Sequence, residues 1–281
     1  LLGFFSFFSS LIGNDLSDKR GGQRPGYALS GGAAQAGADY SLADWLALGV
    51  TAGCGRGKAD VYFPADALVE SRSRHYGAYA AASAGPLRLD LYAGRGSGSY
   101  DTSRTLSFGG ISRKAKGSAD GRTNSVEASA FWRFRTSTPN GLIGPFLTLN
   151  YDHLKTDPFT ETGADSLNLS VEAADARSLR SAAGFRYSEA VTNGGTILKT
   201  RLSAAWLHEY KDQDLPLTAT LAAGGAPFTV RTGDCLRDAL KTSLRAAADF
   251  EGGAGLALEY SGEYRRRLTL HLGTLIFSIK F

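Results

Sequence analysis

Three histidines are the residues of this sequence best suited to acid–base chemistry. His153, His208 and His271 all occupy the apolar register of segments in which polar and apolar residues alternate. A membrane-embedded phospholipase would need a serine, a histidine and a third polar residue together on one face of its wall. Ser203, a serine near His208, falls in the opposite register. We therefore interpret the histidines as hydrogen-bonding residues near the rim of the fold and expect no enzyme activity. A surface protease formed by acidic residues and a histidine among the loops stays open as an alternative.

Two further features have the composition of binding motifs but not their spacing. Cys54 and Cys235 are too few for a disulfide framework and are not spaced as metal ligands. We expect two unpaired thiols, with a disulfide near the long loops as the alternative. The glycine-rich segment 51–58 (TAGCGRGK) does not end in the Gly-Lys-Ser/Thr of a phosphate-binding loop. Its glycines are better explained as small residues of a strand, and the sequence predicts neither a metal site nor a cofactor.

The overall composition limits the classes of protein to consider. The chain has 281 residues with 35 glycines and no methionine, and its 31 basic and 27 acidic residues are scattered rather than clustered. Scattered charge argues against a nucleic-acid partner. No apolar stretch approaches the roughly 18 residues of a transmembrane helix. We expect one domain over residues 1–281 that is a piece of a longer precursor, because the first residue is Leu1 rather than methionine.

Alternation with a period of two residues dominates the sequence. Leu46, Leu48 and Val50 alternate with small residues, and Leu240 and Leu244 lie in a segment that alternates with charged ones. This pattern is typical of strands with one apolar and one polar face, whereas a helix would scatter both sets around its surface. About twelve such segments of roughly ten residues each predict an all-β fold, a transmembrane antiparallel up-and-down β-barrel.

The connections between these strands alternate between short and long. Short ones are expected near residues 41–44, 85–86, 136–141, 189–195 and 251–254, and long polar ones at 13–25, 57–71, 97–121, 156–177 and 211–237, with a tighter one near 265–267. Short turns at one end and long loops at the other are typical of bacterial outer-membrane barrels. An even strand number then places both chain ends on the short-turn, periplasmic side. Residues 1–25 are expected to form the first strand and loop, because the last strand needs a partner that closes the ring.

Alternation alone does not say which face of the strands meets lipid. A soluble β protein would bury the apolar face, and periodicity leaves that alternative open. However, the apolar face is rich in alanine, which fills a soluble core poorly, and the polar face carries charges suited to a hydrated lumen. The predicted lumen residues are Arg88, Asp90, Glu127, Arg133, Arg180, Arg186, Lys199, Arg201, Lys241, Arg245, Glu259 and Glu263. Aromatic residues near strand ends in the apolar register are typical of lipid–water interfaces, and this predicted girdle comprises Tyr40, Trp45, Trp132, Tyr151, Tyr187, Trp206 and Tyr260.

Four segments, taken together in their order, resemble the β-domain of bacterial autotransporters, the translocators of type V secretion. They are residues 100–113 (YDTSRTLSFGGISR), 159–171 (FTETGADSLNLSV), 205–210 (AWLHEY) and 237–240 (RDAL). The C-terminal segment 273–281 (GTLIFSIKF) is also similar to the final strand that the barrel-assembly machinery reads in outer-membrane proteins. Leu275, Phe277, Ile279 and Phe281 share one face of it, and we predict that they form this assembly signal.

The resemblance implies a function as well as a fold. It implies a twelve-stranded barrel whose lumen holds an α-helix leading from an N-terminal passenger, and we expect neither helix nor passenger within this sequence. The barrel would anchor the autotransporter in the outer membrane and mediate export of the passenger to the cell surface. Its partners would be outer-membrane lipid, its own passenger and linker helix, and the assembly machinery, and we expect a monomer. A passive pore without cargo is the alternative, followed by an outer-membrane lipase.

Overall fold

The computed structural model describes residues 5–18, 26–62, 66–211, 216–231, 237–266 and 268–280. Nearly all of them belong to antiparallel strands, and the only helical segment within these ranges is a 3-10 turn at Asp165–Leu167. Cys235 and Phe281 lie outside the described residues, as do parts of the predicted first strand and loop.

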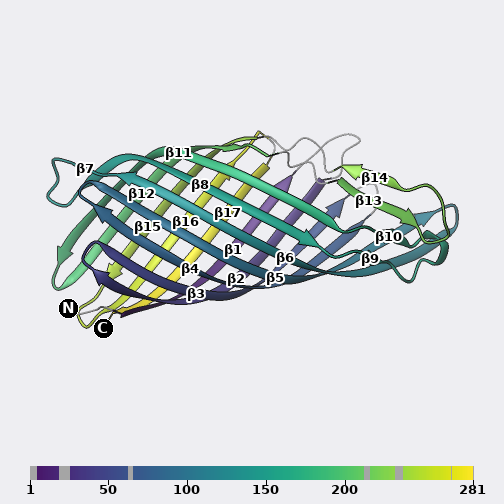
Figure 1. Ribbon diagram of the computed structural model, residues 1–281, viewed down its shortest axis with the longest axis horizontal. Coiled ribbons are helices and arrows are strands. Elements are labelled where there is room, and N and C mark those ends of the chain that lie inside the picture. Colours follow the sequence, from purple (N-terminus) through teal and green to yellow (C-terminus); the bar gives the residue numbers. More distant parts are fainter. Residues whose placement is uncertain are drawn as a thin grey trace.

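Twelve strands form a closed ring (Figure 1). In chain order they are β1 (Phe5–Asp18), β2 (Gly26–Ala43), β3 (Leu46–Tyr62), β4 (Ala67–Ala84), β5 (Leu87–Phe108), β6 (Ile111–Trp132), β8 (Leu142–Thr156), β11 (Ala174–Asn193), β12 (Thr196–Glu209), β15 (Asp238–Asp249), β16 (Ala254–Tyr264) and β17 (Leu268–Lys280). Each pairs with its neighbours in antiparallel register, and β17 pairs with β1 to close the ring. A two-residue strand, β7 (Phe134–Arg135), adds to β8. The predicted twelve-stranded antiparallel barrel is confirmed.

The two ends of the barrel differ in their connections. Residues 44–45, 85–86, 133–141, 194–195 and 250–253 connect strands at one end, which we call the short-turn end. The other end, the loop end, carries the connections that begin after β1, β3, β5, β8, β12 and β16. β1 begins and β17 ends at the short-turn end (Figure 1), as an even number of strands requires.

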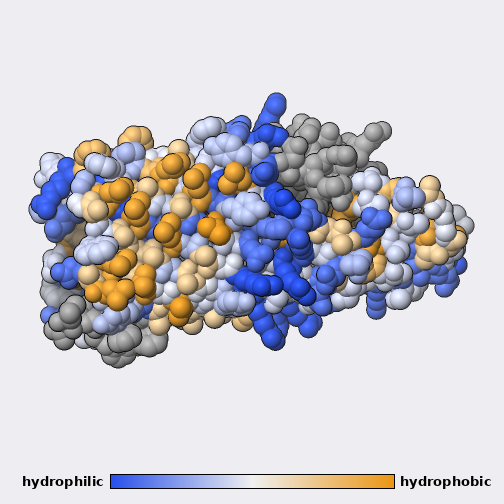
Figure 2. All heavy atoms as spheres, viewed as in Figure 1, coloured by the Kyte–Doolittle hydropathy of each residue, from blue (hydrophilic) through white to orange (hydrophobic). Residues whose placement is uncertain are grey.

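The short-turn half of the barrel has an apolar outer surface, and its interior contains little hydrophobic core. Val50 and Leu91 have 61% and 56% of their surface exposed. By contrast, the buried apolar residues in the described ranges are mostly alanine, and the largest are Phe131 and Phe146 in one small cluster. A soluble protein would bury its leucines and valines. The apolar belt that Figure 2 shows over the short-turn half of the molecule is therefore the lipid-facing surface.

The inner wall is lined by small residues against which aromatic rings lie. Gly49 on β3 faces the Tyr79 ring from β4, and a Cβ atom at Gly49 would overlap that ring. A Cβ atom at Gly94 would likewise overlap the side chain of Tyr92, which lies on the same strand, β5. Tyr79 also donates a hydrogen bond of 2.8 Å to Asp39 on β2. The rings are thus held along the wall, which keeps the bore wider than rings projecting into it would allow.

Replacing Gly49 with valine tests this arrangement. The added side chain displaces the Tyr79 ring and breaks its hydrogen bond to Asp39, so we expect a destabilisation of about 1–3 kcal/mol, the usual cost of overpacking. The measurement is the temperature at which the purified barrel changes from fast to slow migration on SDS gels. Gly273→Val is the matched control, because nothing lies within 4 Å of a Cβ atom at Gly273. Equal losses of stability in both variants would contradict the role of Gly49.

Several strands extend further toward the loop end than their alternation indicates. The loop expected at 97–121 is part of a hairpin, in which the 22-residue strands β5 and β6 meet at Gly109 and Gly110, both with positive φ. The loop expected at 57–71 similarly contains the ends of β3 and β4. Both predictions were wrong for one reason. Beyond the lipid both faces of a strand meet water, so the apolar–polar alternation that identifies strands is lost there.

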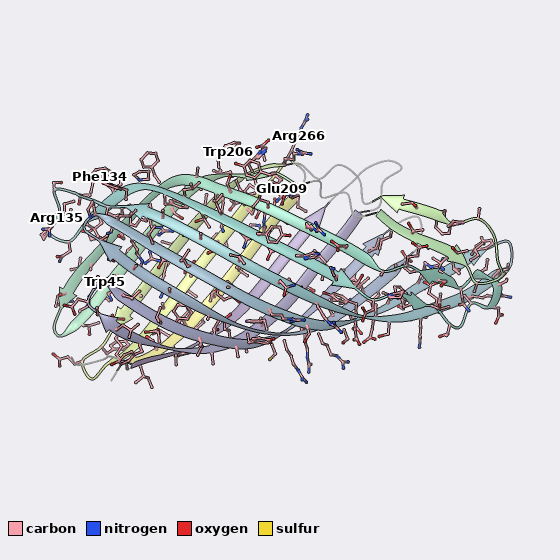
Figure 3. The ribbon with its side chains drawn as sticks, in the orientation of Figure 1. Trp45, Phe134, Arg135, Trp206, Glu209 and Arg266 are labelled. Atoms are coloured by element: carbon pink, nitrogen blue, oxygen red, sulfur yellow. The ribbon has the colours of Figure 1, made fainter. Side chains whose placement is uncertain are left out.

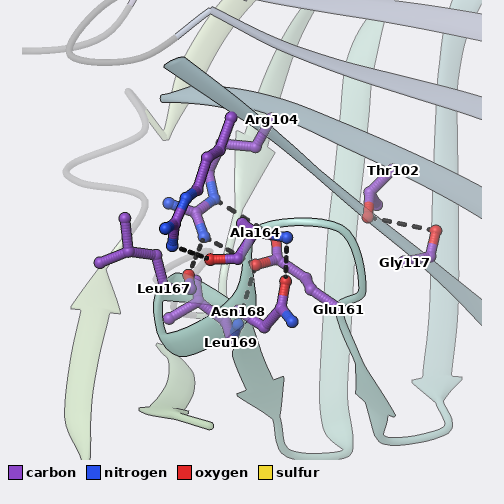
Figure 4. Close-up of polar contacts among 9 residues, drawn as sticks. Thr102, Arg104, Gly117, Glu161, Ala164, Leu167, Asn168 and Leu169 are labelled. Carbon is purple, nitrogen blue, oxygen red and sulfur yellow. Dashed lines mark hydrogen bonds and ion pairs between the residues drawn. The ribbon is translucent and has the colours of Figure 1, made fainter. Parts of the chain in front are cut away.

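A second sheet of four strands lies at the loop end. It consists of β9 (Phe159–Thr160), β10 (Leu169–Val171), β13 (Pro216–Leu221) and β14 (Phe228–Arg231), within the long connections 157–173 and 210–237. Arg104 of β5 attaches it to the barrel (Figure 4), since its guanidinium lies 2.6 Å from the buried Glu161 carboxylate and donates to the Leu167 carbonyl oxygen at 3.1 Å. Two of the segments that carry the family resemblance, 100–113 and 159–171, therefore contact each other.

Candidate functional site: the pore and its lining

The interior of the barrel collects charged side chains from strands around the ring. Residues in the register opposite to the exposed apolar residues point inward. By this criterion eleven of the predicted lumen residues lie on the inner face: Arg88, Asp90, Glu127, Arg180, Arg186, Lys199, Arg201, Lys241, Arg245, Glu259 and Glu263. The lumen is therefore the part of the fold that concentrates chemistry-bearing groups.

Arg133 is the exception and requires a correction. β6 ends at Trp132, so the alternation of that strand does not continue to Arg133. Its guanidinium instead donates to the carbonyl oxygens of Gly85 and Pro86 in the neighbouring turn, at 2.9 and 3.2 Å. Arg133 thus stabilises the short-turn rim rather than lining the lumen.

Many of the inward charges form short ion pairs along or between strands. The pairs are Arg88–Asp90 at 2.7 Å, Lys199–Asp249 at 2.6 Å, Lys280–Asp249 at 3.1 Å, Arg180–Asp152 at 3.2 Å, Arg245–Glu259 at 3.4 Å and Arg265–Glu263 at 2.6 Å. Through Lys199 and Lys280, Asp249 on β15 links β12 to β17, the strand that closes the ring against β1. Such pairs fix charged side chains in the bore and leave a polar surface rather than a hydrophobic plug.

Four arginines form a cluster toward the short-turn end of the bore, which we call the pore arginines. Arg201 on β12 is close enough to Arg88, Arg186 and Arg245 to be repelled by each of them, and Glu259 partly offsets this repulsion. Three of these residues come from the consecutive strands β11, β12 and β15, where Arg201 is paired with Arg245, and Arg88 comes from β5, which β6 and β8 separate from β11. With Asp90 and Glu259 as the acidic groups among them, the cluster keeps an excess of positive charge.

Arg186 is held by aromatic rings as well as by charge. Its guanidinium carbon lies 5.0 Å from the centre of the Phe131 ring and 4.7 Å from that of Phe146. A cation over an aromatic face is attracted by the ring's electron density. The two rings also belong to the small buried cluster of the barrel wall, so they hold Arg186 in a fixed position in the bore.

The histidines form hydrogen bonds on the outer face of the barrel. His153 Nε2 lies 2.9 Å from Asp175, and His271 Nδ1 lies 2.6 Å from the Tyr260 hydroxyl. Desolvation raises the pKa of the Asp175 carboxyl, but hydrogen bonding and charge from His153 and Arg177 outweigh it and bring the pKa below its usual range. Asp175 therefore remains an ionised acceptor, which agrees with the structural interpretation of these histidines.

His208 comes closest to a catalytic arrangement. Its Nδ1 lies 2.9 Å from Asp238, and Ser181, which sequence reasoning missed, is directly opposite His208 on β11. The Ser181 hydroxyl, however, hydrogen-bonds the Tyr210 hydroxyl at 3.0 Å, and the four histidines form no hydrogen bond to a serine in the described part of the chain. Ser203, the residue considered from sequence, bonds Ser243 on the inner face at 2.7 Å. Among the residues that the structure describes, no histidine is therefore hydrogen-bonded to a serine that it could activate.

The predicted girdle residues lie on the outer face at two levels. Figure 3 shows Trp45 near the short-turn end and Trp206 about halfway along the molecule. Tyr40, Trp132 and Tyr187 lie in the short-turn portions of their strands, whereas Tyr151 and Tyr260 lie closer to the loop end. Sequence reasoning missed three exposed tyrosines: Tyr76 in the middle of β4, Tyr210 directly after β12, and Tyr264 at the loop end of β16.

The last strand presents an unbroken outer row. Phe277 and Ile279 are each about half exposed, at 50% and 49%, and Leu275 lies in the same register. β17 is paired on both sides, to β16 and to β1. In the folded barrel these side chains therefore face lipid, and their edge is available to an assembly factor only before the ring closes.

The described residues were also compared with the requirements of a metal site, a disulfide and a membrane-spanning helix. In these ranges no group of three or more His, Cys, Asp and Glu side chains could hold a metal ion. Cys54 is a free, exposed thiol on β3. Across the same ranges, no helix is long and apolar enough to span a membrane.

A closed barrel with an apolar outer belt, aromatic residues at its edges and a charged lumen is the architecture of an outer-membrane β-barrel protein. Residues 7–261 match the model of the autotransporter β-domain, and the chain belongs to this family of outer-membrane translocators. The comparison with curated proteins finds no match.

Solved structures show the same fold at low sequence identity. The translocator domain of the autotransporter NalP from Neisseria meningitidis is 19% identical with a TM-score of 0.77, over 99% of this chain and 88% of that one. The β-domain of the Bordetella autotransporter BrkA is 16% identical with a TM-score of 0.69, over 99% of both chains. The transport unit of AIDA-I from Escherichia coli is 13% identical with a TM-score of 0.68, over 98% and 90%.

The pore arginines predict an anion-selective bore. In planar bilayers with a salt gradient, we expect the double variant Arg201→Gln/Arg245→Gln to lower the anion-to-cation permeability ratio at least about twofold, because the field in a narrow polar channel depends on its wall charges. The control is Arg72→Gln/Arg74→Gln, which removes the same charge from residues in the outward register of β4. An unchanged ratio in the Arg201/Arg245 variant would rule out the pore arginines as its source.

Proposed function

We propose that this barrel anchors an autotransporter in the outer membrane and delivers a passenger, attached at its N-terminal side, to the cell surface. The observation that carries the proposal is the bore itself. It is enclosed by twelve strands, its wall is thinned by inward glycines, and its charges are held in place by pairing. Eight strands leave an interior filled by side chains and sixteen leave an open channel. Twelve strands leave room for a single segment of chain.

The same proposal includes an orientation in the membrane. The short-turn end faces the periplasm and the loop end faces outward, as in bacterial outer-membrane barrels with short periplasmic turns and longer extracellular segments. The long hairpin of β5 and β6 and the second sheet both lie at the loop end, which supports this assignment. A passenger joined to the start of β1 then begins on the periplasmic side and must pass the membrane to reach the surface.

The partners follow from the same features. Lipid of the outer membrane covers the apolar belt, and the passenger with its linker helix occupies the bore. All strand edges of the ring are paired within the chain, which supports a monomer. Because the histidines are bonded to Asp175, Asp238 and Tyr260, we also propose that the barrel itself is not an enzyme.

The export function can be tested with a reporter passenger. An epitope-tagged passenger and a helical linker are fused to the N-terminal side of the full chain and expressed in a Gram-negative host. We expect added protease to remove the epitope from intact cells, because the barrel carries its own passenger across the membrane. The control fuses the same passenger to an unrelated twelve-stranded outer-membrane porin of equal abundance. Passenger that stays protected behind a correctly folded barrel would favour the passive pore instead.

The assembly signal is tested separately in the last strand. Phe277→Ser/Ile279→Ser removes two members of the predicted row, and deletion of Phe281 removes a third. We expect either change to lower the amount of folded barrel in the outer membrane severalfold, because a partner that pairs with this edge loses its side-chain contacts. Folded barrel is measured by its fast migration on unheated gels. Val50→Ser/Leu91→Ser, which alters lipid-facing residues elsewhere in the belt, is the control. An equal loss in this control would assign the effect to lipid contact alone.

A further inference from the structure

Five arginines on the outer face of neighbouring strands form an uncompensated basic surface. They are Arg56 on β3, Arg72 and Arg74 on β4, Arg95 on β5 and Arg122 on β6, and we call them the outer arginines. All five are exposed. No hydrogen bond or ion pair holds any of them within the described part of the chain. The inward residues Arg88, Arg180 and Arg245, by contrast, each have a carboxylate oxygen within 3.4 Å.

The outer arginines lie directly beyond the apolar belt. Val50, Ala78, Ala93 and Val126 are aligned across β3, β4, β5 and β6 and form an apolar row on the outer face. Moving along these strands toward the loop end, the next three outward rows contain all five outer arginines. Figure 2 shows the corresponding change, from the apolar belt to a hydrophilic band across the molecule. Such a position, next to the end of the hydrocarbon region, is where lipid headgroups lie.

The register of the strands makes a shallow trough between the guanidiniums. Ser97 on β5 is paired with Arg74 on one side and Arg122 on the other. Neighbouring strands are about 4.8 Å apart, so the two arginine backbones lie roughly 10 Å apart across one small serine. Ser99 is placed in the same way between Arg72 and Asp120.

Acidic groups near the trough do not neutralise it. Asp120 is the one carboxylate within the three rows on β3 to β6, against five arginines. Glu70 and Asp101 belong to the following row, where Lys58 lies opposite Glu70. The acidic side chains therefore mark the outer boundary of the basic surface, and the inner boundary is the apolar row.

We propose that the outer arginines bind the phosphate groups of a lipid whose headgroup carries more than one phosphate, namely the phosphorylated glucosamine lipid of the outer leaflet. Guanidinium groups bind phosphate oxygens through paired, charge-assisted hydrogen bonds. The acyl chains of such a lipid continue along Val50, Ala78, Ala93 and Val126, while its phosphates lie between Arg74 and Arg122. The assignment to the outer leaflet rests on the orientation proposed above. The binding site itself requires only the belt and the arginines.

Native mass spectrometry of the purified full chain in detergent tests the proposal. The probe is bis-phosphorylated lipid A, compared with the same lipid after removal of both phosphates and with phosphatidylglycerol. We expect Arg72→Gln/Arg74→Gln to weaken binding of bis-phosphorylated lipid A about thirtyfold, which corresponds to about 1 kcal/mol for each lost charge near a lipid surface. The dephosphorylated lipid should bind the wild-type chain and the variant equally.

The matched control is Lys114→Gln/Lys116→Gln. These residues lie in the outward register of β6, and Lys116 is six residues from Arg122, about 20 Å along the strand. We expect this variant to bind within about twofold of the wild type, since it removes equal charge away from the belt. Fast migration on unheated gels verifies that each variant is folded.

Three outcomes would overturn the proposal. The first is equal loss in the two double variants, which would make the effect one of net charge. The second is phosphatidylglycerol binding as tightly as bis-phosphorylated lipid A. The third is displacement of the lipid by equimolar inorganic phosphate, which would show a site for free phosphate. Because no passenger takes part, a failure here is distinguishable from a failure of export.

Discussion

The hydrogen bonds between β1 and β17 are the interaction on which the remaining structure depends. In hydrocarbon, each unpaired backbone N–H or C=O group costs several kcal/mol, so a sheet that crosses lipid cannot keep an open edge. The pairing runs from Ser6 opposite Lys280 to Asp18 opposite Leu268 and covers both strands almost completely. Once the ring is closed, every strand has one face toward lipid and one toward the bore. This explains why large apolar residues such as Val50 and Leu258 are exposed, each at 61%, rather than buried in a core.

Closure of the ring also limits the size of the side chains that the inner wall can carry. A ring of twelve strands has a fixed circumference, so the width of its bore depends on how far side chains extend from the wall. Inward glycines such as Gly49 and Gly94 let tyrosine rings lie along the wall, and the Arg88–Asp90 pair holds its charges to neighbouring positions of one strand. Arg186 is positioned by the aromatic rings of Phe131 and Phe146. The inner wall is thus lined by small residues and by charges held close to it, which suits the proposed passage of a passenger segment.

Much of the barrel could be predicted from the sequence, because in lipid each strand must alternate between two different solvents. That constraint disappears beyond the belt, and the errors follow from its loss. The loop-end portions of β5 and β6 were expected to be loops. Arg133 was assigned to β6, which ends one residue earlier. The contact of Arg104 with Glu161 joins residues 57 positions apart through a buried carboxylate, and no local pattern encodes it. The outer arginines were overlooked because several of them stand among serines and glycines that gave the appearance of loops.

The register of the strands is protected differently at the two ends of the barrel. Near the short-turn end, a slip of one residue in β5 would turn Arg88 and Asp90 toward hydrocarbon and Leu89 and Leu91 toward the bore. A basic side chain facing lipid at the middle of the bilayer costs about 2–4 kcal/mol. Each basic residue of the lumen therefore also fixes the register of its strand, because a slip would turn it toward lipid. At the loop end both faces of a strand meet water, so a shift of its register costs little free energy. There the register depends on the tight turn at Gly109 and Gly110 and on the attachment of Arg104 to the second sheet. The charges of the bore therefore serve the fold as well as transport, while the outer arginines, which lie beyond the belt, are free of that role.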